Sequence, residues 1–336
     1  MPNPFWNAEE HRLRAVPRIL VFLLVWGLLA LGMVLVMSDF LTPLVPKDSI
    51  LQTPVGQDSF LFAALINPLG PLVASVLGLL VAARILDRRP VSEYGFHFNG
   101  QWFADLGAGL LIGIFLMAAI FFVELMTGMI QVTGVLQSNE NAVSFGPGLL
   151  VGVITYLCVG IYEEMFTRGN PLRNLAEGFN WKRLGPGTAL TLGYIGSSIL
   201  FGFLHILNQN VTPFAIVNLI IAGLWLGLPY VLTGELGLSI GMHIAWNFCE
   251  GCLFGFPVSG SAAMATILAI QQKGPELLTG GLFGPEGGMV GLLAMLLGCL
   301  LVLGWVRLTR GQITWQTQLA IYSPVESQAD LATAEK

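Results

Sequence analysis

The stretch that decides how this chain is organised is Glu163-Glu164-Met165-Phe166-Thr167-Arg168-Gly169, which directly follows the apolar run 149–162. Charged side chains at bilayer depth are costly, so they mark a candidate functional site. On a helix, Glu164 and Arg168 are four residues apart and share a face, so they can pair. Glu163 is rotated by about a third of a turn and has no such local partner. The pattern predicts a supporting role for the Glu164 carboxylate and a chemical role for the unpaired Glu163 carboxylate.

The composition identifies an integral membrane protein without any motif. Of the 336 residues, 54% are hydrophobic and only 10% are charged, against about 25% charged in soluble domains. No basic cluster indicates a nucleic-acid partner, and the partner that the composition implies is the lipid bilayer. Cys249 and Cys252 form a lone Cys-x-x-Cys, which is weak evidence for zinc or redox chemistry. We interpret the cysteines as packed membrane thiols.

Eight apolar runs approach or exceed the length of about 20 residues that spans a bilayer. They predict an all-α, multi-pass transmembrane bundle of about eight helices with a membrane-embedded polar cavity, and the first run is interpreted as a signal anchor. Prolines in the second run predict a kink or a later start. The fourth run is expected to kink or end near Asn170-Pro171, with Asn170 capping a short interfacial helix to about Gly178. The runs are 19–37, 60–83, 106–130, 148–166, 188–207, 213–233, 237–257 and 288–308.

The distribution of basic residues predicts the orientation. With the N-terminus inside, all but two of the 15 lysines and arginines fall on the inner side, the exceptions being Lys47 and Lys273. This bias follows the positive-inside rule, so both termini are expected in the cytoplasm of a prokaryotic-type cell. We expect a cytoplasmic segment over 1–18, a transmembrane domain over 19–310 and a polar, disordered tail over 311–336.

Two later helices carry the polar residues that a hydrolytic site needs. His205 lies near the end of the fifth apolar run, and His243 and Asn247 lie four residues apart in the seventh, so they share a face. Glu163 would serve as general base, and a histidine opposite it would help to hold a water. His243 and Asn247 would donate to a developing oxyanion, where one such donor contributes about 3 kcal/mol.

Other interpretations of the same residues stay open. Glu164 and Arg168 can form a purely structural bridge, and a single intramembrane histidine can be a helix–helix hydrogen bond. Zinc is a second possibility for the hydrolytic site, because Glu163, His205 and His243 are suitable ligands by type, although no His-Glu-x-x-His is present.

Two further acids lie within apolar runs. Glu124 and Glu250 are interpreted as structural or cavity-lining residues. A transporter that uses them would be expected to show repeat symmetry, and none is visible in the sequence.

Taken in order, three motifs resemble a known family. They read Glu-Glu-x-x-x-Arg at 163–168, Phe-x-x-x-His at 201–205 and His-x-x-x-Asn at 243–247. This set resembles the CPBP family of intramembrane glutamic proteases, which comprises the CAAX prenyl protease type II enzymes and the bacteriocin-processing proteins. The resemblance covers about residues 100–260.

The resemblance implies roles for the four residues that are expected to be catalytic. Glu163 would activate the water together with His205, and His243 and Asn247 would stabilise the oxyanion. The family implies no metal and no cofactor. The implied activity is cleavage of a peptide bond in a membrane-associated, possibly prenylated, protein or peptide. A non-catalytic scaffold or bacteriocin-immunity partner that retains the fold is the alternative.

The remaining motif residues have supporting roles by the same resemblance. Glu164 and Arg168 would support the site. One position departs from the commoner pattern, because Thr167 stands where an aromatic residue usually precedes the arginine. Local packing around Arg168 is therefore expected to differ.

The three motifs must reach a common depth in the membrane if they form one site. As straight rods, the helices would place His205 near the outer end of its helix and Glu163 near the inner end of its own. We expect either a long, tilted fourth helix, a fifth helix that begins outside the bilayer, or a polar run at 208–210 that dips into a cavity. The last is preferred. The Glu163 carboxylate, His205, His243 and Asn247 should then line one cavity within about 10 Å.

Overall fold

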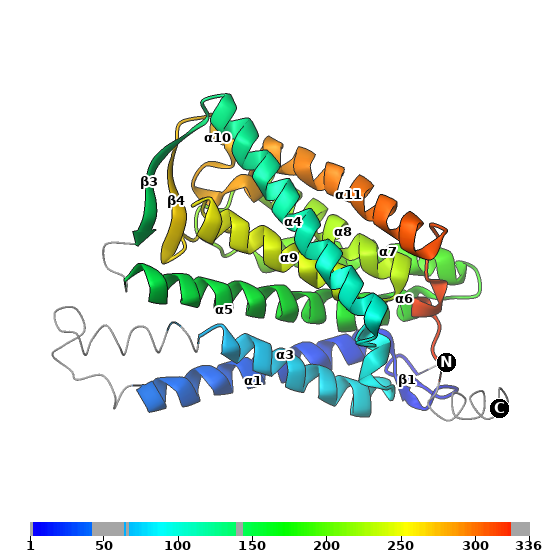
Figure 1. The fold of residues 1–336 in the computed structure, drawn as a ribbon. Helices are drawn as coiled ribbons and strands as arrows, with labels where there is room; N and C mark the ends of the chain where they lie inside the picture. The colour runs from blue at the N-terminus through cyan, green and yellow to red at the C-terminus, as the bar shows by residue number, and fades with distance from the viewer. Residues whose placement is uncertain (1–2, 42–63, 65–66, 139–143, 324–336) are drawn as a thin grey trace.

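A computed structural model describes residues 3–41, 64, 67–138 and 144–323, and shows a bundle of long helices (Figure 1). Each of the eight predicted apolar runs overlaps one of them, so the all-α, multi-pass architecture is confirmed. The principal helices are α1 (Ala15–Leu41), α3 (Leu69–Val81), α4 (Gly100–Met126), α5 (Phe145–Glu164), α7 (Gly185–Leu204), α8 (Pro213–Thr233), α9 (Gly237–Phe248) and α11 (Met289–Arg310).

Seven helical runs in the described part of the chain are long and apolar enough to cross a membrane. The predicted run 237–257 is not among them, because α9 has 12 residues and continues only as a π-helix, η5 (Cys249–Leu253). The predicted run 60–83 begins outside the described residues. Its helix α3 starts at Leu69, directly after Pro68, which agrees with the later start that the prolines predict.

The fourth run is longer than predicted and does not end at Pro171. α5 passes into a π-helix, η4 (Met165–Leu172), and then into α6 (Arg173–Phe179), giving 35 helical residues, or roughly 52 Å. The wider π turn accommodates Pro171, whose ring would otherwise meet the preceding turn. The prediction that Asn170 caps a new helix is wrong, because Asn170 lies inside η4 and Leu172 directly precedes α6; the Asn170 amide instead donates to Asp87 at 2.9 Å.

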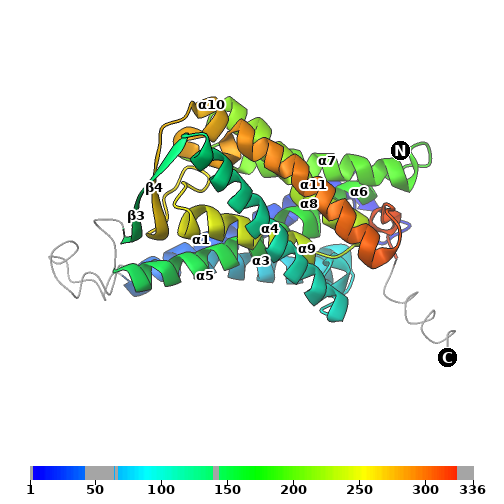
Figure 2. The same ribbon diagram turned by 45° about the horizontal axis from the view of Figure 1, so that its top comes forward.

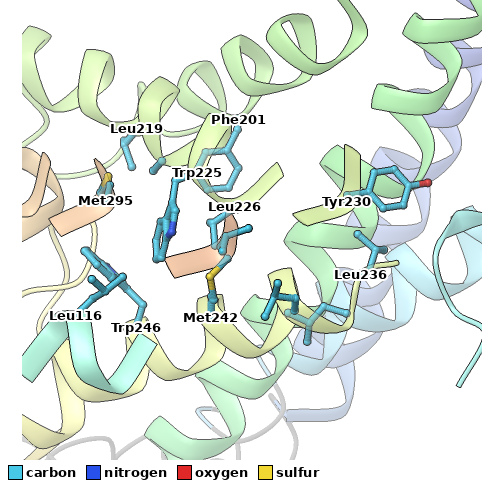
Figure 3. Packing of buried hydrophobic residues seen from close by; sticks show 14 of the residues in the cluster. Leu116, Phe201, Leu219, Trp225, Leu226, Tyr230, Leu236, Met242, Trp246 and Met295 are labelled. Atoms are coloured by element: carbon cyan, nitrogen blue, oxygen red, sulfur yellow. The ribbon is translucent and has the colours of Figure 1, made fainter. Parts of the chain in front are cut away.

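The core is built where α4, α8, α9 and α11 meet. The rings of Trp225 and Trp246 lie 4.9 Å apart between centroids and anchor a buried apolar cluster (Figure 3). α4 and α9 approach closely because glycines face each other. A Cβ on Gly109 would lie 2.3 Å from the Leu238 carbonyl oxygen, and one on Gly241 would lie 2.2 Å from the Leu106 carbonyl oxygen. Such small-residue contacts let membrane helices pack backbone to backbone.

A two-stranded antiparallel ribbon lies at one end of the bundle and was not predicted. Strand β3 (Ile130–Ser138) pairs with β4 (Ala265–Gln272), with Ile130 opposite Gln272. Figures 1 and 2 show the ribbon at the end away from α6. The two strands come from loops far apart in the sequence, so no local hairpin signal was available.

Both described ends of the chain lie together at the opposite end of the bundle. A short hairpin, β1 (Trp6–Asn7) with β2 (Arg12–Leu13), precedes α1, and the Arg12 guanidinium lies 3.3 Å from the centroid of the Tyr322 ring. A 3₁₀ turn over Thr317–Ala320 buries Leu319. Leu319 and Ala320 are buried, so this part of the predicted disordered tail packs against the bundle, whereas residues 311–315 are exposed and 324–336 lie outside the described residues.

A buried ion cluster fastens the N-terminal segment to this end. Arg18 donates to Asp87 at 2.7 Å, and Arg12 and Arg18 both reach Glu177 of α6, at 2.9 and 3.0 Å. Arg89 also pairs with Glu177. Arg12 and Arg18 are almost completely buried, so the predicted segment 1–18 is held against the bundle at these two residues.

Candidate active site

Close packing of α5 on α9 brings the three motifs together. A Cβ on Gly160 would lie 2.9 Å from the Ile244 backbone nitrogen, so only glycine permits this approach. Glu163 and Glu164 end α5, one turn beyond this contact. His243 lies on the facing turn of α9, and His205 immediately follows the last residue of α7.

One oxygen of Glu163 faces both histidines. Its Oε2 lies 3.9 Å from Nε2 of His205 and 3.8 Å from Nε2 of His243. Both separations exceed a direct hydrogen bond, so Glu163 faces the two imidazoles without bonding to either of them. The Glu163 side chain is 19% exposed, so it is neither sealed in the core nor freely solvated.

The ring of His205 is oriented by the backbone. Its Nδ1 lies 2.8 Å from the carbonyl oxygen of Phe201. A carbonyl can only accept, so Nδ1 carries the proton in this contact. In the neutral ring, Nε2 then presents a lone pair toward Glu163.

Glu164 and Arg168 form the predicted pair, and both are completely buried. One Arg168 nitrogen donates to Glu164 Oε1 at 2.8 Å, and the other donates to the Gly223 carbonyl oxygen of α8 at 3.0 Å. Glu164 Oε1 also lies 2.8 Å from Nδ1 of His243. This last contact was not predicted, and it means that Glu164 orients the imidazole of His243.

Phe201 lies among the charged and imidazole groups of the site. Its ring centroid is 4.4 Å from the Arg168 guanidinium carbon, 4.9 Å from the His205 ring and 6.1 Å from the His243 ring. Its contacts extend to a cation–π arrangement with Arg168.

Asn247 lies one helical turn beyond His243 and is 4% exposed. Its Oδ1 is buried without a hydrogen-bond partner among the described residues. A buried, unsatisfied amide is costly in a membrane interior. The unpaired Oδ1 can accept a hydrogen bond from a group that enters the site, whereas the oxyanion role needs the Nδ2 group of the same amide as donor.

A cavity of about 690 Å³ connects these residues, and Glu163, His205, His243 and Asn247 all line it. The depth problem is resolved by the long α5–α6 run, which carries Glu163 near its middle, and by the polar segment after α7. Asn208 and Gln209 line the cavity, and the Asn208 amide donates to the Ser259 carbonyl oxygen at 3.1 Å. The preferred expectation for residues 208–210 is met in part, because Asn208 and Gln209 line the cavity, whereas Asn210 does not and, like Gln209, is exposed.

Glu286 is a cavity residue that the sequence did not reveal. It lies in the turn before α11 and accepts a hydrogen bond from the Ser259 hydroxyl. Burial raises the pKa of Glu286 above that of a free glutamate. The available sequence signal was an acid inside the glycine-rich turn 284–288, which by itself indicates no function.

The metal interpretation has weak geometric support. No group of three histidine, cysteine or acidic side chains in the described part of the chain is arranged to hold a metal ion. Zinc ligands at about 2.0–2.1 Å from the metal lie roughly 3.3–3.4 Å from one another in a tetrahedral site. The separations of 3.8 and 3.9 Å from Glu163 to the histidines are longer than this.

The other singled-out residues lie outside the cavity lining. Glu124 and Glu250 are completely buried, and neither is among the lining residues. Cys249 and Cys252 are free and buried, as predicted for packed thiols.

Comparison with known proteins identifies one family. The family model described as type II CAAX prenyl endopeptidase Rce1-like matches residues 145–249, less than half of the chain. The match contains all three motifs. No curated protein and no solved structure matches the chain. Residues 145–249 of this multi-pass membrane protein are therefore similar to the type II CAAX prenyl endopeptidases, in agreement with the resemblance of the three motifs to the CPBP family.

Proposed function

We propose that this protein is an intramembrane endopeptidase that hydrolyses a peptide bond with a glutamate-activated water. The observation that carries the proposal is the position of Glu163 Oε2, 3.9 Å from His205 Nε2 and 3.8 Å from His243 Nε2. A carboxylate between two imidazole nitrogens, in a cavity that is partly apolar, provides a base and a place for the water.

Glu163 and His205 act on the water. The water donates one hydrogen to the Glu163 carboxylate and the other to the lone pair of His205 Nε2, which the Phe201 carbonyl keeps free of a proton. Glu163 takes the first proton as the water oxygen attacks the scissile carbonyl carbon. General base catalysis of this kind contributes roughly 10²–10⁴-fold. Glu163 then returns the proton to the leaving amine, so the step needs no further reactant.

His243 and Asn247 act on the carbonyl oxygen. When His243 is protonated on both nitrogens, Nδ1 donates to Glu164 and Nε2 can donate to the oxyanion. The Asn247 amide, one turn away, supplies the second donor. Loss of one such donor lowers kcat by about 10²–10³-fold.

Glu164 and Arg168 are positioning residues in this mechanism. Glu164 fixes the His243 ring through Nδ1, and Arg168 fixes Glu164 while it donates to the α8 backbone at Gly223. Neither residue lines the cavity. Their substitution is therefore expected to disturb the orientation of His243 and the stability of the bundle.

The proposed mechanism uses no metal and no cofactor, and the substrate is a membrane-associated protein or peptide, with or without a prenyl group. The test is cleavage of a library of quenched fluorescent peptides, with and without a prenyl group, by the purified full-length protein. Wild type is compared with Glu163→Ala and His205→Ala. Cleavage by wild type and at least about 100-fold slower cleavage by both variants is expected.

Three other results would decide against the proposal or a part of it. Equal cleavage by wild type and both variants would remove Glu163 and His205 from the mechanism. Activity that a chelator abolishes and zinc restores would replace the metal-free mechanism with a zinc-dependent one. A scaffold or immunity partner would cleave no peptide at all.

A further inference from the structure

The lining residues of the cavity are exposed at one end, its mouth, and mostly buried at the other. Its lining runs along α5 from Val151 to Thr167, a rise of about 24 Å. Gln209, Ser261 and Ala262, which also line it, are exposed. At the other end, Phe166 and Thr167 are buried, with 5% and 0% exposure. The mouth therefore lies beside the segment that leads into β4, at the ribbon end of the bundle.

The basic residues gather at the opposite end. They occupy the N-terminal hairpin, the segment between α3 and α4, the turn between α6 and α7, and the end of α11 (Figure 1). At the ribbon end of the described chain, Lys273 is the one basic residue. The basic end carries Arg12, Arg14, Arg18, Arg84, Arg88, Arg89, Arg173, Lys182, Arg183, Arg307 and Arg310.

The side of the membrane follows from this charge asymmetry. Segments rich in lysine and arginine stay in the cytoplasm, because translocating them is unfavourable. The contact of Arg12 with Tyr322 places both described chain ends on that same side. The ribbon, the loops that surround the mouth, and the mouth itself then face the non-cytoplasmic side.

The lining also indicates which part of a substrate can enter. It contains two carboxylates, Glu163 and Glu286, and no lysine or arginine among the described residues. A free C-terminal carboxylate is usually bound by such cations or by backbone amides. The polar mouth, with Asn208 and Ser261, offers only uncharged groups. An internal peptide segment therefore fits this lining better than a chain end.

We infer that the catalytic cavity opens on the non-cytoplasmic face and receives an internal segment of an exported protein or peptide, and not the C-terminus of a cytoplasmic prenylated protein. The substrate part of this inference rests on the proposed endopeptidase function. The orientation part does not, because it depends only on where the charges and the mouth lie.

The orientation test introduces single cysteines and labels intact bacterial cells that express the full-length protein. The reagent is a membrane-impermeant maleimide, and wild type measures background labelling of the native cysteines. Ala262→Cys at the mouth is expected to react in intact cells. Lys182→Cys, in the turn at the basic end, is expected to react only after permeabilisation. The reverse pattern would overturn the inference.

A second pair of measurements tests the cavity and the substrate. Thr155→Cys, on the cavity wall of α5, should react with a small charged thiosulfonate in intact cells; reaction only after permeabilisation contradicts an outward mouth. In sealed vesicles of known orientation, wild type should cleave an internal-segment peptide at least about 10-fold faster when it is supplied on the face where Ala262→Cys reacts. Faster cleavage of the peptide when it is supplied on the other face overturns the substrate assignment. Faster cleavage of prenylated C-terminal peptides than of the internal-segment peptide overturns it as well. Absence of all cleavage refutes the proposed function and leaves the orientation result standing.

Discussion

The buried pair of Glu164 and Arg168 makes the sharpest stability prediction. Arg168→Leu removes a guanidinium that donates to Glu164 at 2.8 Å and to the Gly223 carbonyl oxygen at 3.0 Å, with both side chains fully buried. Removal of one partner of a buried ion pair costs about 3–5 kcal/mol, because the other charge is left uncompensated. At roughly 2 °C per kcal/mol for a large domain, the apparent Tm should fall by about 6–10 °C.

A double-mutant cycle separates the pair from general packing loss. The apparent Tm and denaturant midpoint in detergent are measured for wild type, Arg168→Leu, Glu164→Gln and the double variant. Partners in contact show coupling energies of about 0.5–3 kcal/mol, so the double variant should be more stable than the sum of the single losses predicts. Arg183→Leu, at an exposed position in the turn before α7, is the control and should change Tm little. A change in Tm of under about 1 °C for Arg168→Leu would refute the supporting role of the pair.

Three further predictions concern catalysis, packing and pH. Asn247→Ala should lower kcat by about 10²–10³-fold with a small change in KM, as measured by peptide cleavage, and an unchanged kcat would remove it from the oxyanion site. Gly109→Ala should lower Tm strongly, because its Cβ would lie 2.3 Å from the Leu238 carbonyl oxygen, whereas Gly107→Ala, with open space around it, should not; equal effects would contradict the close α4–α9 contact. Burial raises the pKa of Glu286, so this group should destabilise the protein progressively as the pH rises above the ordinary glutamate value of about 4.3. Glu286→Gln should flatten the fall of Tm with rising pH, and an identical pH profile would count against that account.

Local sequence rules predicted most of the bundle and the relation between neighbouring motif residues. Apolar runs of sufficient length predicted the helices, because a membrane-spanning segment must pair its backbone N–H and C=O groups within itself. The four-residue spacing of Glu164 and Arg168 gave their pairing, which the 2.8 Å contact bears out. These features depend only on helical period and hydropathy.

Features that depend on tertiary packing could not be predicted from local rules. The β3–β4 ribbon pairs Ile130 with Gln272, and neither strand has a turn that marks it as a hairpin. Pro171 indicated a helix end, but a π-helix carries the chain past it because Asn170 and Arg173 are held by buried partners. Glu286 joins the cavity only because the turn before α11 packs against Ser259.

The candidate site falls between these two cases. From the sequence we predicted four site residues, namely Glu163, His205, His243 and Asn247. Local rules could not predict that they lie at one depth in the helix bundle. Close glycine contacts bring these residues together, because Gly160 lets α5 pack against the backbone of α9. The contact of Glu164 with His243, which follows from that packing, could not be read from spacing alone.

The most direct test of the central claim is kcat for Glu163→Gln on a peptide that wild type cleaves, in metal-depleted buffer. Glutamine keeps the shape of the side chain and cannot accept the water proton, so the folded protein and KM should change little. We predict that kcat falls by at least about 100-fold, as expected for loss of a general base. A variant that is equally stable and retains more than about a third of wild-type kcat would contradict the assignment of Glu163 as the group that activates the water.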